Sequence, residues 1–226
     1  ISMESHQLRD KALKAIDNTA FYPSKGKERL KSMIETRPDW CVSRQRVWGV
    51  PLPIFVNKKT KEILVDDKVI ENIASIYEKE GSDCWFSDNP QRFLGDKYNV
   101  EDYEKLSDIV EVWFDSGSTH SFVLEKREDL KWPASMYLEG SDQHRGWFHS
   151  SLLESCGTRG RAPFESILSH GFVVDGKGLK MSKSLGNVIA PEDILKKYGA
   201  DILRIWVASS NYAEDLRIDF SILDQH

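Results

Sequence analysis

The stretch YLEGSDQHRGWF (137–148) decides the fold, because it carries an apolar strand directly into a helix. Glu139 and Asp142 follow the strand and can accept hydrogen bonds from hydroxyls or an ammonium. Gly140 lets the backbone approach a ligand closely. Ligands of open α/β sheets lie beyond the carboxyl ends of the strands, so we expect a nucleotide site here. The plainer interpretation is a helix N-cap at Asp142 among solvated acids.

The residues around this stretch alternate between strand and helix patterns. A strand at 136–138, a helix at about 142–155 and a strand near 167–168 precede a Gly-rich loop and helices near 191–197 and 200–209. This order predicts an α/β fold with a doubly wound, Rossmann-type parallel sheet.

The first part of the chain adds helical and hairpin patterns. Two apolar stripes predict helices, one with Leu8, Ala12, Ala15 and Ile16, the other with Leu30, Met33 and Ile34, starting near Ser24 and ending before Pro38. Residues 47–56 contain two prolines and fit an extended edge segment, followed by a hairpin with its tip at 57–61. A helix near 69–77 ends at Gly81, and the charged residues 78–107 are expected to form a surface insertion.

Composition excludes several classes of protein. The 226 residues have a net charge of −5, so bulk charge does not indicate a nucleic-acid partner. No run approaches the ~18 apolar residues of a membrane helix, and the first residues do not resemble a signal peptide. The three cysteines form no C-x-x-C pair, so we expect neither a disulfide framework nor a bound metal, and we expect a cytoplasmic location.

The loop DGKGLKMSKSLGN (175–187) has the residues of a phosphate-binding segment. Its glycines allow backbone amides to approach an anion, and Lys180 and Lys183 could place two ammoniums on one phosphate chain. A generic loop of this composition would simply be solvated and basic.

The wording of these segments indicates a family. The sequence KMSKS (180–184) followed by Gly186 and Asn187 resembles the signature of class I aminoacyl-tRNA synthetases. Four further strings resemble bacterial-type isoleucyl-tRNA synthetases over nearly the whole chain: RPDWCVSRQRVWGVP (37–51), VWFDSGSTH (112–120), EGSDQHRGWF (139–148) and HGF (170–172).

The resemblance implies roles for individual residues. Lys180 and Lys183 would act in catalysis, with Lys183 making the main contact with the ATP phosphates. Glu139, Gly140, Asp142 and Gln143 would line the aminoacyl-adenylate, with Gln143 near the substrate ammonium, and His170 and Gly171 would lie near the adenine. Trp113 and Trp147 would wall a pocket for a branched aliphatic side chain, although core packing is the commoner role of a tryptophan. Arg44 and Arg46 are left out of the site, because surface salt bridges explain them.

The resemblance also implies substrates and an internal segment of a longer enzyme. The substrates would be L-isoleucine, ATP with Mg²⁺ and tRNA(Ile), in a monomer whose zinc ligands lie outside this chain. Class I synthetases also carry an H-x-G-H motif, which these 226 residues lack. We therefore expect that this chain alone does not form the adenylate. The expected parts are a helical return from the editing insertion (1–44), a connective region (45–133), the second Rossmann half with the KMSKS loop (134–199) and the start of a helical region (200–226). A valyl-tRNA synthetase segment and a non-catalytic nucleotide- or tRNA-binding module are the alternatives.

Overall fold

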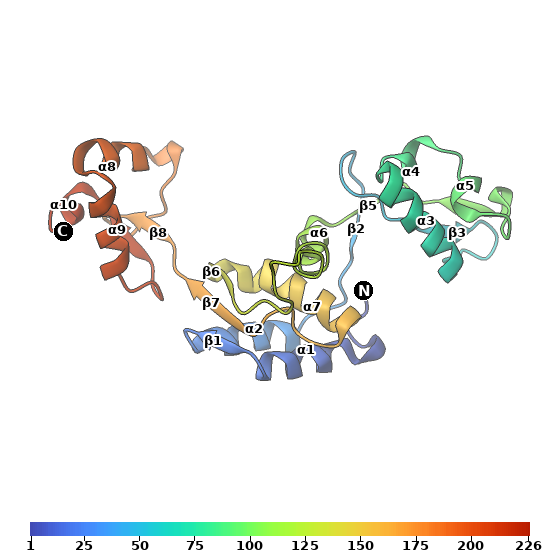
Figure 1. Ribbon diagram of the computed structural model, residues 1–226, viewed down its shortest axis with the longest axis horizontal. Coiled ribbons are helices and arrows are strands. Elements are labelled where there is room, and N and C mark those ends of the chain that lie inside the picture. The colour runs from blue at the N-terminus through green and yellow to red at the C-terminus, as the bar shows by residue number, and fades with distance from the viewer. The chain divides into compact units, whose positions relative to one another are not determined.

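The computed structural model describes residues 1–226, which form two compact units (Figure 1). The smaller unit contains 1–2 and 39–116, and the larger contains 3–38 and 117–226.

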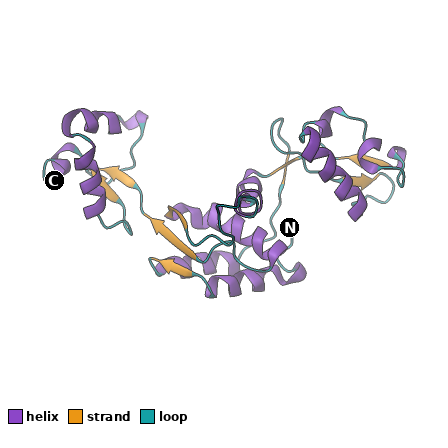
Figure 2. Cartoon of the chain, in the orientation of Figure 1, coloured by secondary structure: helices purple, strands orange, loops and turns teal.

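A three-stranded parallel sheet organises the larger unit, in the order β1-β7-β6. Its strands are β1 (Ala20–Tyr22), β6 (Tyr137–Gly140) and β7 (Ser166–His170). Figure 2 shows these strands with the neighbouring helices in purple. The predicted α/β class with a parallel sheet is confirmed. The strand β1 was not predicted, because its three residues lie between two helices and are too few to show a period.

Three helices pack beside this sheet: α1 (Leu8–Asp17), preceded by the 3₁₀ turn η1 (Ser5–Gln7), then α2 (Lys25–Glu35) and α7 (Trp147–Arg159). The stripes predicted for the first two helices are confirmed, since Ala12, Ile16, Leu30 and Ile34 are buried. The helix α7 carries the fully buried Phe148 and Leu152 and is buried over most of its length, which explains why it shows little amphipathic periodicity.

The start of α7 differs from the prediction. The single helix expected from about 142 is split into the 3₁₀ turn η4 (Ser141–Arg145) and α7, with a break at Gly146. Neither Ser141 nor Asp142 caps a helix. Instead the Gln143 side-chain oxygen accepts a hydrogen bond of 2.8 Å from the backbone N–H of Trp147, which satisfies one of the free donors at the start of α7.

A second core lies near the end of the chain. It joins the parallel pair β8 (Val173–Asp175) and β9 (Leu216–Ile218) to the helices α8 (Pro191–Tyr198), α9 (Ala200–Ser209) and α10 (Phe220–Leu223). The core consists of Ile194, Trp206, Ile218 and Leu223. The helices predicted near 191–197 and 200–209 are confirmed. The KMSKS loop and its 3₁₀ turn η5 (Lys183–Leu185) connect β8 to α8.

The smaller unit has its own aromatic core. Its elements are β2 (Ser43–Arg44), β3 (Phe55–Asn57), α3 (Asp67–Glu80), α4 (Cys84–Ser87), α5 (Gln91–Leu94), the 3₁₀ turn η2 (Val100–Asp102), β4 (Tyr103–Lys105) and β5 (Ile109–Val110). The helix α6 (Val112–Gly117) ends one residue past this unit, and the π-helical segment η3 (His120–Leu124) belongs to the larger unit. The helix ending at Gly81 is confirmed. Residues 78–107 contribute the buried Trp85 and Phe93 to this core.

The predicted hairpin around 57–61 is confirmed as a short one: Val56 bridges to Ile63, and the N–H groups of Asn57 and Leu64 each donate 2.8 Å to the carbonyls of Glu62 and Phe55. The sequence did not predict the strand that pairs with β3, which is β4. The strand β4 lies more than forty residues after β3 in the chain. The alternation of side chains along a strand does not show which distant strand it pairs with.

Candidate functional site

The carboxyl ends of β6 and β7 bring three of the predicted site residues together. Gly140 and His170 are partners in the strand register. A Cβ atom on Gly140 would lie 2.7 Å from an Asp142 carboxylate oxygen and 3.8 Å from the His170 ring. The absence of a side chain at Gly140 therefore lets a carboxylate and an imidazole approach the same point of the sheet edge.

The acidic and amide side chains at this edge are held by short local hydrogen bonds. Glu139 is exposed and accepts 3.0 Å from the backbone N–H of Gly140. Gln143 donates 3.1 Å to the Asp142 carboxylate while its oxygen caps α7. An amide oxygen has a second lone pair, so Gln143 can hold the helix and still accept from an ammonium.

Trp147 lies against the start of the sheet. Its ring stacks on Tyr137 at a centroid distance of 4.0 Å and an interplanar angle of 1°. The Tyr137 hydroxyl shares a 3.1 Å hydrogen bond with Ser151, and burial raises the pKa of Tyr137 to about 12. Trp113 is 41% exposed and belongs to the smaller unit, so its pairing with Trp147 in one pocket stays a prediction.

The segment 212–214 packs against the backbone at His170 and Gly171. The His170 Nδ1 atom lies 2.8 Å from the carbonyl oxygen of Gly171. The N–H of Gly171 donates 2.9 Å to the carbonyl of Tyr212, and a Cβ atom at Gly171 would lie 2.2 Å from the backbone oxygen of Glu214. Close backbone approach therefore requires glycine at 171, whatever ligand binds nearby.

Lys180 and Lys183 are the two predicted phosphate contacts. Both side chains are exposed, and neither ammonium forms a hydrogen bond or an ion pair. The backbone of Lys180 bridges to Val174 of β8, and Lys183 opens the turn η5, whose N-cap is Ser182. Two ammoniums without a carboxylate partner are available to an anionic ligand.

Two residues that support this loop were missed by sequence reasoning. The Asp175 carboxylate and the Asn187 amide bond to one another and to the loop backbone. The sequence signals were their position at the two ends of the Gly-rich segment and, for Asn187, its place in the string that resembles the family signature. A hollow of about 510 Å³, lined by loop residues and by Ile218 and Asp219, lies beside them.

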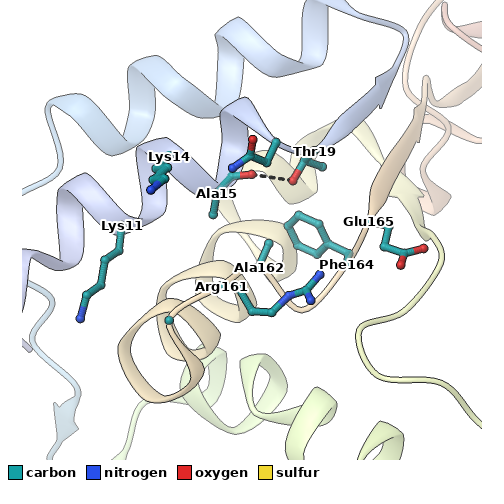
Figure 3. A pocket seen from close by; sticks show the side chains of 10 residues that line it. Lys11, Lys14, Ala15, Thr19, Arg161, Ala162, Phe164 and Glu165 are labelled. Atoms are coloured by element: carbon teal, nitrogen blue, oxygen red, sulfur yellow. Dashed lines mark hydrogen bonds between the residues drawn. The ribbon is translucent and has the colours of Figure 1, made fainter.

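A separate hollow of about 420 Å³ lies at the other end of the parallel strands (Figure 3). Its lining includes Thr19 and Glu165, which immediately precede β1 and β7, whereas Gly140 and His170 end their strands. Lys11 and Lys14 of α1 also line it. Lys14 lies in the last turn of the helix, where a cation stabilises the helix dipole, so its position needs no ligand.

The remaining candidates have structural environments. No three His, Cys, Asp or Glu side chains converge in a way that could hold a metal ion. The three cysteines are free, and His144 and His149 are buried beside the sheet. Arg44 donates to the backbone carbonyls of Cys41 and Ser43 rather than to a carboxylate, so the salt bridge expected for it is wrong. No helix combines the length and hydrophobicity of a membrane crossing.

The parallel sheet, the polar residues at its carboxyl edge and the lysine-bearing loop define a class of protein. A family model described as tRNA synthetases class I (I, L, M and V) matches residues 1–219, and the chain belongs to this family.

The relatives are more specific about the amino acid. The chain is 89% identical, over its whole length, to an isoleucine–tRNA ligase of Pelagibacter ubique, of which it covers 25%. It is 58% identical over 96% of its length to an isoleucine–tRNA ligase of Zymomonas mobilis, covering 23% of that protein. The chain thus spans about a quarter of the length of these relatives.

Solved structures share the fold. A Mycobacterium tuberculosis methionyl-tRNA synthetase in complex with methionyl-adenylate matches 97% of this chain and 35% of its own, with a TM-score of 0.63 and 19% identity. Agrobacterium radiobacter K84 agnB2 LeuRS, in a ternary complex with tRNA and LeuAMS, matches 82% of this chain and 26% of its own, with a TM-score of 0.55 and 22% identity.

Proposed function

We propose that this chain is a segment of an isoleucine–tRNA ligase, which joins L-isoleucine to ATP as isoleucyl-adenylate and transfers it to tRNA(Ile). One observation carries the proposal: a sheet edge with Gly140, Asp142 and His170 together, and a KMSKS loop with two unpaired lysines. The 89% identity to an isoleucine–tRNA ligase supports the choice of amino acid.

The residues divide the chemistry between them. Glu139, Asp142 and Gln143 bind the ribose hydroxyls and the ammonium of the adenylate, and His170 lies beside the adenine. Lys180 and Lys183 neutralise the phosphates as the isoleucine carboxylate attacks the α-phosphate, because preplaced cations stabilise charge that develops in the transition state. Mg²⁺ accompanies ATP and is held mainly by phosphate oxygens. We further propose a monomeric, cytoplasmic enzyme.

The flat ring of Trp147, stacked on Tyr137, suits an aliphatic side chain because it excludes water without offering an unpaired hydrogen-bonding group. Valine is the nearest competing substrate. A pocket that differs by one methylene discriminates by roughly 10–200-fold, so isoleucine should lead valine by no more than this in activation.

The test is amino-acid-dependent exchange of pyrophosphate into ATP by the full-length enzyme, with isoleucine, valine and leucine compared by kcat/KM. We expect the highest kcat/KM with isoleucine, and a higher value with valine would contradict the proposal.

Thermal melting of the 226-residue chain with a non-hydrolysable isoleucyl-adenylate analogue gives a second readout. The analogue should raise the melting temperature, and Glu139→Ala should abolish this increase. At 100 times its Kd a ligand adds about 2.7 kcal/mol of stability. This chain alone should show no exchange.

A further inference from the structure

The KMSKS loop is closed by one amide side chain, that of Asn187. Its oxygen accepts 2.9 Å from the backbone N–H of Ser182, and its NH₂ group donates 3.2 Å to the carbonyl of Lys180. The backbone is therefore pinned on both sides of Met181. The Met181 side chain packs against the core formed by Ile194 and Trp206, which fixes the same point from the other side.

The orientation of this amide is set by Asp175. The second hydrogen of the Asn187 NH₂ group donates 2.8 Å to one Asp175 carboxylate oxygen. The other Asp175 oxygen accepts from the backbone N–H groups of Lys177 and Leu179, at 3.0 and 2.8 Å. A flipped amide would place its oxygen against the carboxylate and its NH₂ against an N–H, so only one orientation satisfies every group.

The charge of Asp175 is maintained by the same contacts. Only 9% of Asp175 is exposed, and the hydrogen bonds from Asn187 and from the Leu179 N–H hold its pKa below the usual value. Lys177 also lowers it, while Asp219, which faces it from the start of α10, is the nearby acid. The carboxylate is thus ionised and fully engaged with the loop.

Resting on the proposed function, we propose that Asp175 and Asn187 are positioning residues for ATP activation. They set the backbone between Lys180 and Lys183, and so align the two ammoniums on the phosphate chain. Neither residue needs to contact the nucleotide. The side chains of Lys180 and Lys183 form no hydrogen bond or ion pair that would hold their relative placement. The bridge to Val174 fixes the backbone of Lys180, and the hydrogen bonds of Asn187 hold the segment from Lys180 to Ser182, directly before Lys183.

The experiment measures ATP-dependent adenylate formation by the full-length enzyme at varied ATP and isoleucine. Asn187→Ala should lower kcat by roughly 10–100-fold, since a misplacement of about 1 Å can cost that much, and should leave the KM for isoleucine unchanged. Asn99→Ala is the matched control, because it removes a side-chain bond to the N–H of Glu101 in the smaller unit. It should leave kcat within twofold of wild type.

A double-mutant comparison separates positioning from simple stabilisation. In a Lys183→Ala background, Asn187→Ala should cost less than threefold, because the cation it aligns is gone. The exchanged pair Asp175→Asn with Asn187→Asp keeps the hydrogen bond between the two residues in reverse, and should recover part of the rate lost by Asn187→Asp alone. An unchanged kcat in Asn187→Ala, or an equal loss in the Lys183→Ala background, would overturn the positioning role. Failure of the wild-type enzyme to activate isoleucine would instead refute the proposed function.

Discussion

The two segments that carry the candidate site are built on opposite principles. In 137–159 most side chains of α7 are buried, and apolar contacts from Phe148 and Leu152 hold the backbone. In 175–187 the side chains are mostly exposed, and the backbone is held by hydrogen bonds from Asp175 and Asn187.

This difference fits the two ligands proposed for them. An amino-acid pocket needs fixed walls, because discrimination between aliphatic side chains depends on packing. A phosphate contact needs cations that stay solvated until the ligand arrives, and a polar scaffold can hold a loop without burying them.

The apolar segment should lose the most stability when truncated. Leu152→Ala removes a fully buried side chain from α7 and leaves a cavity, so we predict a loss of about 2–5 kcal/mol in the free energy of unfolding. Urea denaturation of the chain followed by circular dichroism measures it. A loss under 1 kcal/mol would show that the packing around α7 is loose.

The polar loop should instead lose function without losing stability. In the full-length enzyme we predict that Lys183→Ala costs roughly 3–4 kcal/mol of transition-state stabilisation, or 10²–10³-fold in adenylate formation, by analogy with removal of one preplaced donor. The melting temperature should not change, because the ammonium has no partner in the folded chain. A rate within threefold of wild type would contradict the role of this lysine.

How far sequence reasoning reached depended on how local the signal was. The stripes of α1, α2 and α3 predicted those helices, because their apolar positions repeat within one element. The strand-end residues Glu139, Gly140 and Asp142 were predicted from the rule for parallel sheets, whereas Gln143 was predicted only from the family resemblance. Sequence reasoning did not predict the cap on α7 by Gln143, the pairing of β3 with β4 or the brace, by which we mean the hydrogen-bonded pair Asp175 and Asn187. Each of these depends on a contact that only the folded chain defines.

Acid should weaken the buried segment through His149. Burial lowers the pKa of His149 from 6.5 to about 4, and its side chain is only 4% exposed in the folded chain. As the pH falls, the histidine of the unfolded state takes up a proton before that of the folded state. The free energy of unfolding is therefore highest above pH 6.5 and decreases as the pH drops toward 4, by up to about 3 kcal/mol. Urea titrations between pH 7.5 and 4.5, wild type against His149→Leu, measure the difference. Equal pH dependence in both would refute it.

The smallest change in stability is predicted for a second Leu→Ala substitution, made in the KMSKS loop. Leu185 lies in η5, two residues after Lys183, and is 65% exposed, so Leu185→Ala removes little buried surface and should change the free energy of unfolding by at most about 0.5 kcal/mol. The measurement is the urea titration used for Leu152→Ala, with the m-value required to match wild type. A loss of 2 kcal/mol or more would mean that the loop is held by apolar packing after all. The contrast between the two segments would then fail, and the brace of Asp175 and Asn187 would be one support among several.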